Sequence, residues 1–86
     1  MTVIWRKSFT KDYRKLSQDY KEAWLKAYRL FLYRPHDMKL RRHKLQGKYN
    51  GLQSIDVTPD LRALFHETPN SHYTFYYLRN HNQLYS

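Results

Sequence analysis

Apolar positions in the first third of the chain follow first a strand pattern and then two helical patterns. Residues 2–6 are β-branched and aromatic, which predicts a short strand. Helical spacing then predicts a first helix ending near Ser17. Asp19 and Glu22 have the spacing of a capping box for a second helix, which Pro35 ends. One stripe of this second helix is apolar and should face the core: Tyr20, Ala23, Trp24, Ala27, Tyr28, Phe31 and Leu32.

Three strand-like runs occupy the second half of the chain, after an irregular and strongly basic segment at residues 36–50. The runs span residues 52–57, 61–67 and 73–79, and short proline-containing turns join them. Such turns imply antiparallel pairing. The sequence therefore predicts one α+β domain over residues 1–86, in the order βααβββ. Its antiparallel sheet should have about four strands, with both helices on one face and the other face free.

Charge and composition narrow the classes of function. Sixteen Lys and Arg against seven Asp and Glu give a formal net charge of +9. This excess indicates a polyanionic partner, with nucleic acid first, an acidic protein second and an anionic membrane third, although a merely solvated basic surface is the alternative. The chain has no cysteine, which excludes disulfides and thiolate metal sites. No apolar run has the length of a membrane span, and we expect a cytoplasmic protein with no membrane partner.

Side-chain alternation in the run 61–67 sorts its residues between the two faces of the sheet. Leu61, Ala63 and Phe65 should face the helices. Asp60 and Arg62 then lie on the open face or its rim, where catalysis can occur.

A ribonuclease that uses the 2'-hydroxyl of its substrate as nucleophile needs a base, a cation for the phosphorane and an acid for the leaving 5'-oxygen. Histidine suits proton transfer, since its unperturbed pKa is about 6.5, and arginine suits the phosphate. His43, His81 and Arg62 form a sufficient set, with Asp60 or Asp56 to orient a histidine or act as base. Any one histidine taken alone is more often a surface residue. No histidine pair has metal-ligand spacing, so we predict no metal and no cofactor.

The basic segment supplies candidates for binding a phosphate backbone, although a solvated loop explains its charges equally well. The candidate substrate-binding residues are Arg41, Arg42, Lys44, Lys48, Asp56 and Arg79.

Three stretches of the chain resemble the RelE superfamily of toxins from bacterial toxin–antitoxin pairs. Residues 43–47 have the form His-x-Leu-x-Gly, residues 55–65 contain a valine-x-proline-aspartate turn, and residues 80–85 hold a histidine followed by Leu and an aromatic. These features are most similar to those of the YafQ-like branch, and their order extends the resemblance over nearly the whole chain.

The resemblance implies an mRNA interferase, a ribosome-dependent endoribonuclease that needs no metal and cleaves mRNA in the A site. Its partners would be mRNA, the ribosome and a cognate antitoxin, which holds it in a toxin–antitoxin heterotetramer. Carried over by position, His43 contributes to the site, Asp60 is the turn aspartate and His81 is central to acid–base work. Tyr85 would contact the substrate base, and Arg62 would stabilise the phosphate.

Two further readings stay open beside this one, and three positions depart from the branch. Asp56 stands where the branch can carry another histidine, Arg79 and Asn80 replace Gly-Thr before His81, and Leu61 replaces a tryptophan. ParE-type toxins share the fold and poison DNA gyrase without cutting RNA. A non-catalytic RNA-binding module is the third candidate. The assembled histidines and aspartates favour the nuclease.

Overall fold

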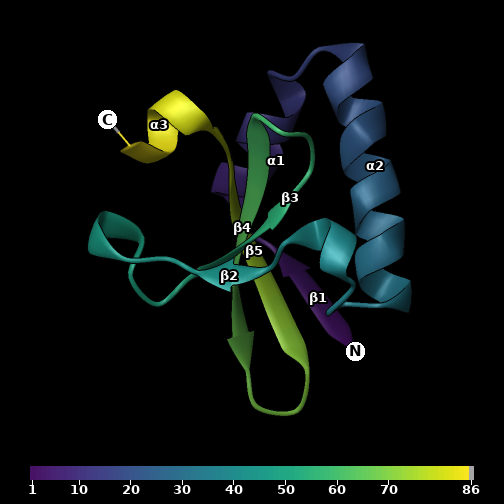
Figure 1. Cartoon of the computed structure of the whole chain (residues 1–86), viewed down its shortest axis with the longest axis vertical. Coiled ribbons are helices and arrows are strands. Elements are labelled where there is room, and N and C mark those ends of the chain that lie inside the picture. The colour runs from purple at the N-terminus through teal and green to yellow at the C-terminus, as the bar shows by residue number, and fades with distance from the viewer. Residues whose placement is uncertain (86) are drawn as a thin grey trace.

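The computed structural model describes residues 1–85 and shows an α+β fold, as the sequence predicts (Figure 1). One five-stranded sheet has the order β1-β5-β4-β3-β2. The strands are β1 (Thr2–Trp5), β2 (His43–Lys44), β3 (Gln53–Asp56), β4 (Leu61–Thr68) and β5 (His72–Asn80). The helices are α1 (Lys7–Arg14), α2 (Gln18–Tyr33) and α3 (His81–Tyr85), and short 3-10 helices η1 (Met38–Leu40) and η2 (Gly47–Tyr49) flank β2.

Several details of the sheet differ from the prediction. The sheet has five strands rather than about four, because the segment expected to be irregular contributes the short strand β2. The pairing is antiparallel except between β1 and β5, which run parallel. A parallel pair needs a crossover, and α1 through β4 supply it.

The second helix begins and ends close to the predicted residues, but its cap is different. Ser17 is the N-cap, and its hydroxyl accepts a hydrogen bond from the backbone N–H of Tyr20 at 3.3 Å. The capping box predicted at Asp19 is therefore wrong by two residues. The helix stops at Tyr33, and Arg34 is its C-cap before Pro35.

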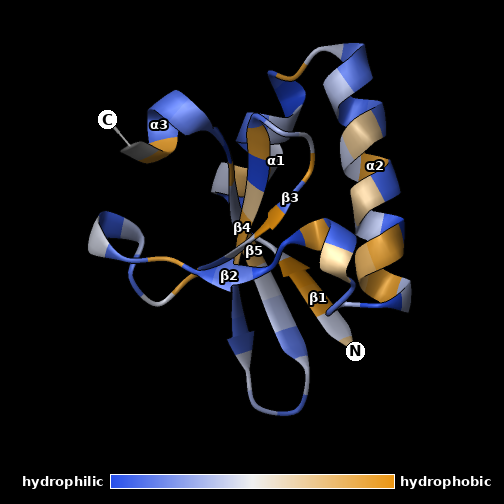
Figure 2. Ribbon diagram, in the orientation of Figure 1, coloured by the Kyte–Doolittle hydropathy of each residue, from blue (hydrophilic) through white to orange (hydrophobic). Residues whose placement is uncertain are grey.

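An aromatic core fills the space between the sheet and the helices α1 and α2. Its rings pack edge to face, with centroids 5.0 Å apart for Phe9 and Trp24 and 5.4 Å apart for Phe31 and Phe65. Of the predicted stripe on α2, Trp24 and Phe31 are buried, whereas Leu32 is exposed. Figure 2 shows the apolar residues of β1 and α2 in orange and most of α3 in blue.

The sequence predicts that the opposite face of the sheet is free, but the structure shows that part of it is covered. Leu64 and Ser54 are fully buried although they lie outside the core cluster on the helical side. The missed helix α3 brings Leu84 to a cavity that it lines together with Leu45 and Tyr49 of the β2–η2 segment. The helix α3 and the β2–η2 segment therefore border part of this face, so the site on it is enclosed on these sides.

The helix α1 covers an edge of β5 that no strand covers. Since β1 pairs only with residues 72–75, the rest of β5 presents unpaired backbone groups on that side. The Ser8 hydroxyl donates to the carbonyl of Tyr76, and the Asp12 carboxylate accepts from the N–H of Leu78 at 3.0 Å. Side chains of α1 thus take the place of a strand. No helix within residues 1–85 is long and apolar enough to cross a bilayer.

Candidate active site

Two rows of residues cross the face of the sheet opposite α1 and α2. Residues that lie directly opposite each other on paired strands project to the same face, so register alone defines the rows. The first row is His43, Ser54, Leu64 and Tyr77, and the second is Asp56, Arg62 and Arg79. The fully buried members of the first row form a floor, and the second row supplies charge.

The second row places two arginines side by side on adjacent strands, and each has its own carboxylate. The Nε of Arg62 lies 3.2 Å from Oδ1 of Asp56, and both side chains are largely buried. The Nε of the exposed Arg41 lies 3.8 Å from the other oxygen of Asp56. Like charges directly opposite each other are destabilising, and these pairings offset that repulsion. Asp56 therefore orients Arg62.

His43 is held by two hydrogen bonds that define its tautomer. Its Nδ1 lies 2.9 Å from the backbone carbonyl of Arg41, and its Nε2 lies 3.4 Å from Oγ of Ser54. Because a carbonyl oxygen can only accept, Nδ1 carries the proton and Nε2 of the neutral ring is an acceptor. This arrangement places Nε2 beside Ser54, on the face of the sheet that carries the arginines.

Asp60 and His81 come together through the backbone at the rim of the same face. The hydroxyl of Thr58 accepts from the N–H groups of Asp60 and Leu61, at 3.2 and 2.9 Å, which stabilises the turn before β4. The carbonyl of Asp60 then accepts the N–H of His81 at 3.1 Å. The side chains of Asn80 and Gln83 cap each other's backbone N–H groups and so fix the start of α3. His81 is exposed at this point.

Arg79 is held by contacts with three side chains. Its Nη1 pairs with Asp12 of α1, its Nε donates to the hydroxyl of Tyr49, and its guanidinium lies 4.3 Å over the ring of Tyr77. Burial opposes the charge, but the hydrogen bonds to Tyr49 and Asp12 outweigh it and raise the pKa of Arg79. This guanidinium is charged at every physiological pH.

The sequence analysis missed both partners of Arg79. Asp12 carries a detectable signal, since it is the only acid in α1 and stands among basic residues of that helix. Tyr49 carries no such signal, because its contact with Arg79 depends on the 3-10 helix η2, which the sequence does not predict.

Arg42 lies away from the charged row, in a cluster of its own. Its side chain is only 8% exposed and donates to Gln53 at 2.8 Å and to Glu67 at 2.7 Å. Burial opposes the charge of Glu67, but the hydrogen bond from Tyr73 and the charge of Arg42 outweigh it and lower the pKa of Glu67. These contacts describe a structural ion pair, and substrate binding by Arg42 stays a prediction.

The other candidates lie at the margins of the site. Lys44 and Lys48 are exposed, and each lines a cavity with Tyr49. Tyr85 ends α3, but its side chain lies outside the described part of the chain. Within residues 1–85, no group of three histidines and carboxylates has the arrangement of a metal site.

Comparison with known proteins defines the fold. No family model and no curated protein sequence matches the chain. The fold is the one seen in solved structures of YafQ and of YoeB-type toxins.

Individual solved structures make the likeness quantitative. YafQ from E. coli superimposes with a TM-score of 0.80 at 17% identity, covering 98% of this chain and 97% of that one. A YoeB/ParE toxin from Agrobacterium tumefaciens gives 0.73 at 19% identity, covering 94% and 99%. The heterotetrameric YoeB–YefM toxin–antitoxin complex from Staphylococcus aureus gives 0.69 at 12% identity, covering 94% and 97%. At such identities the likeness is one of fold.

Proposed function

We propose that this chain is the toxin of a type II toxin–antitoxin system and that it cleaves mRNA on the ribosome. The observation that carries the proposal is the row Asp56–Arg62–Arg79, which lies on one face of the sheet beside His43. His81 lies at the rim of that face, after the last strand. Two guanidinium groups flanked by histidines are the groups that metal-independent cleavage of RNA requires. The shared fold with structures described as toxins supports the same conclusion.

The reaction is a transesterification within the RNA strand. A base removes the proton of the 2'-hydroxyl, and the 2'-oxygen forms a bond to the adjacent phosphorus. The bond from phosphorus to the 5'-oxygen of the next nucleotide breaks, and an acid protonates that oxygen. The products are a 2',3'-cyclic phosphate and a free 5'-hydroxyl, so no water or metal enters the balance.

The residues of the site suit separate parts of this reaction. In the proposal, Arg62 and Arg79 bind the non-bridging oxygens of the phosphate, where negative charge grows in the transition state. His43 and His81 divide the two proton transfers between them. Asp60 lies next to His81 through its backbone carbonyl, which accepts the N–H of His81.

A toxin of this kind needs an antitoxin as its partner in the cell. The charge of +9 attracts an acidic segment, and β1 stands at the end of the sheet order. Within residues 1–85, the outer edge of β1 pairs with no strand, so a partner segment can add to it. A toxin–antitoxin heterotetramer in the cytoplasm, of the kind solved for YoeB–YefM, is the proposed assembly.

Single-turnover cleavage of a labelled mRNA on programmed ribosomes tests the proposal. His81→Ala should lower the rate by about 10²–10⁴-fold, the contribution of one general acid or base. His72→Ala is the matched control, since His72 is an exposed histidine at the other end of β5. An intact mRNA with the wild-type chain would refute the nuclease, and relaxation assays with DNA gyrase would then test the ParE-type alternative.

A further inference from the structure

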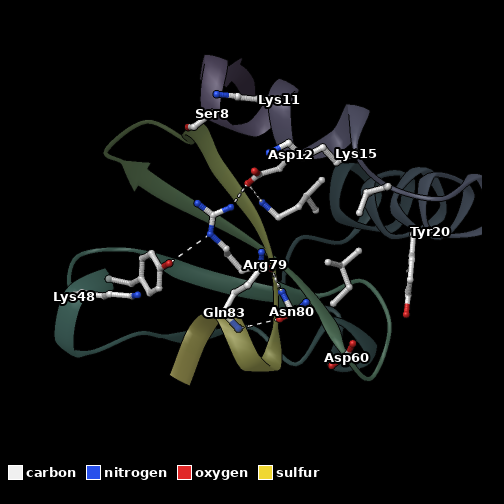
Figure 3. Close-up of a pocket in the computed structure, with 14 residues that line it drawn as sticks. Ser8, Lys11, Asp12, Lys15, Tyr20, Lys48, Asp60, Arg79, Asn80 and Gln83 are labelled. Carbon is white, nitrogen blue, oxygen red and sulfur yellow. Dashed lines mark hydrogen bonds and ion pairs between the residues drawn. The ribbon is translucent and has the colours of Figure 1, made fainter. Parts of the chain in front are cut away.

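A cavity of about 760 Å³ lies between α1, the end of β5 and α3 (Figure 3). It adjoins the candidate active site, because Arg79 and Asp60 belong to both. Its volume is in the range of pockets in which proteins hold small organic ligands. Besides these two residues, its lining includes Lys11, Lys15, Lys48, Tyr20 and Tyr49. We refer to it as the α1–α3 cavity.

Positive charge dominates the α1–α3 cavity. Among the ion pairs formed within residues 1–85, none includes Lys11, Lys15 or Lys48. The carboxylate of Asp12 cannot compensate them, because it is bound to Arg79 and to the N–H of Leu78. Three lysines and Arg79 therefore line this hollow against the carboxylates of Asp12 and Asp60, and the net positive charge of the lining attracts an anion.

Aromatic rings accompany these cations. Tyr20 is 38% exposed although it starts the apolar stripe of α2, and Figure 3 shows it on the opposite side of the cavity from Lys48. Tyr49 lines the cavity as well, with the ammonium of Lys48 5.3 Å from its ring centroid. Cations interleaved with tyrosine rings are typical of surfaces that bind single-stranded nucleic acid, since the phosphates pair with the cations and the bases stack on the rings.

We propose that the α1–α3 cavity binds a nucleotide flanking the cleaved bond, on the same RNA strand. This inference rests on the proposed function and names a second contact for its substrate. The position of Arg79 supports this inference, because Arg79 borders both the charged row and the α1–α3 cavity. An RNA strand that leaves the charged row therefore reaches the cavity next. The phosphate contacts come from Lys11 and Lys15, and the base stacks on Tyr20. An acidic peptide would use the lysines but has no base to place on the exposed ring.

Binding of a non-cleavable RNA measures this contact separately from chemistry. The probes are fluorescein-labelled 2'-O-methyl oligonucleotides of three and nine nucleotides, titrated with the full chain by anisotropy at several salt concentrations. The variant is Lys11→Ala/Lys15→Ala. The control is Lys7→Ala/Arg14→Ala, which removes the same charge from the same helix but outside the cavity.

The nine-nucleotide probe should report the loss of two phosphate contacts. The slope of log affinity against log salt should flatten by about 1.4, which is about 0.7 for each contact with a single strand. The three-nucleotide probe should show no such change, and neither should the control variant. Tyr20→Ala should weaken binding of the nine-nucleotide probe without altering the slope.

Besides an unchanged slope, three results would overturn the inference. The first is an equal flattening of the salt slope in the control variant. The second is an equal flattening of the slope for both probes. The third is tighter binding of a glutamate peptide of matched charge, with the same dependence on Lys11 and Lys15. Ribosome-dependent cleavage by the wild-type chain is measured in parallel. Cleavage without the expected slope change refutes RNA binding in the α1–α3 cavity and does not affect the proposed function. The slope change without cleavage refutes the nuclease and supports the RNA site.

Discussion

Substitution of Asp12 gives the clearest prediction, because two different interactions depend on its carboxylate. It accepts the N–H of Leu78 at the edge of β5 that α1 covers, and it pairs with the guanidinium of Arg79. Asp12→Ala removes both interactions. Asp12→Asn keeps an oxygen that accepts from Leu78 but loses the charge that holds Arg79, so the two variants separate the two contributions.

The structure allows the magnitudes to be worked out. A backbone N–H that loses its partner costs about 1–3 kcal/mol when it is shielded from water. The side chains of Asp12 and Arg79 are 16% and 22% exposed, so the pair lies between an exposed ion pair, which contributes up to about 1 kcal/mol, and a buried one, whose breaking costs about 3–5 kcal/mol. We expect Asp12→Asn to lower the free energy of unfolding by about 1–2 kcal/mol and Asp12→Ala by about 2–4 kcal/mol.

Urea denaturation followed by circular dichroism measures both changes, and the cleavage assay on ribosomes measures the effect on Arg79. Since Arg79 loses its orientation in both variants, both should lose activity to a similar extent while differing in stability. Arg79→Ala combined with Asp12→Asn should lower the free energy of unfolding little more than Arg79→Ala does alone. Equal stability of the two Asp12 variants, or additive effects in the double variant, would refute this account of the carboxylate.

Three further predictions follow from the same structure. Arg62→Ala should lower the rate of cleavage by at least about 10²-fold, a larger factor than its loss of affinity for the 2'-O-methyl probe; a wild-type rate would remove Arg62 from the site. The lowered pKa of Glu67 contributes stability that is complete above its ordinary value of 4.5 and is lost as the pH falls through the lower folded value; Glu67→Gln should flatten that part of the pH–stability curve in urea titrations. Expression of the chain alone should arrest growth, and co-expression of the adjacent small reading frame should restore it; a harmless chain at high level would contradict the toxin.

Local patterns in the sequence were sufficient for the main elements of the fold. The apolar stripe of the second helix, Pro35 after it and the alternation in β4 are all local features, and local features determine helix ends and strand faces. The strand β2 could not be predicted in this way, since only two of its residues pair with β3 and their identity carries no strand pattern. The helix α3 was missed for a similar reason, because five residues are too few for a periodic signal.

The candidate site shows the same limit in its side chains. Alternation correctly placed Arg62 on the face away from α1 and α2, and register then joined it to Asp56. The environment of Arg79 depends on residues 30 and 67 positions away in the chain, and no local pattern reports such distances. By the same alternation Leu64 shares the face of Arg62, and it is fully buried there because α3 and the β2–η2 segment flank that face.

The departure at Asp56 acquires a physical meaning once its partners are known. The YafQ-like branch can carry a histidine at this position, and a histidine there can exchange a proton with substrate. In this chain the position holds a carboxylate bound to Arg62 and near Arg41, and proton transfer from it would release Arg62 from its orienting partner. Asp56 therefore suits the placement of a cation better than acid–base work. In the proposed reaction the proton transfers then fall to His43 and His81, and Arg62 and Arg79 supply the positive charge.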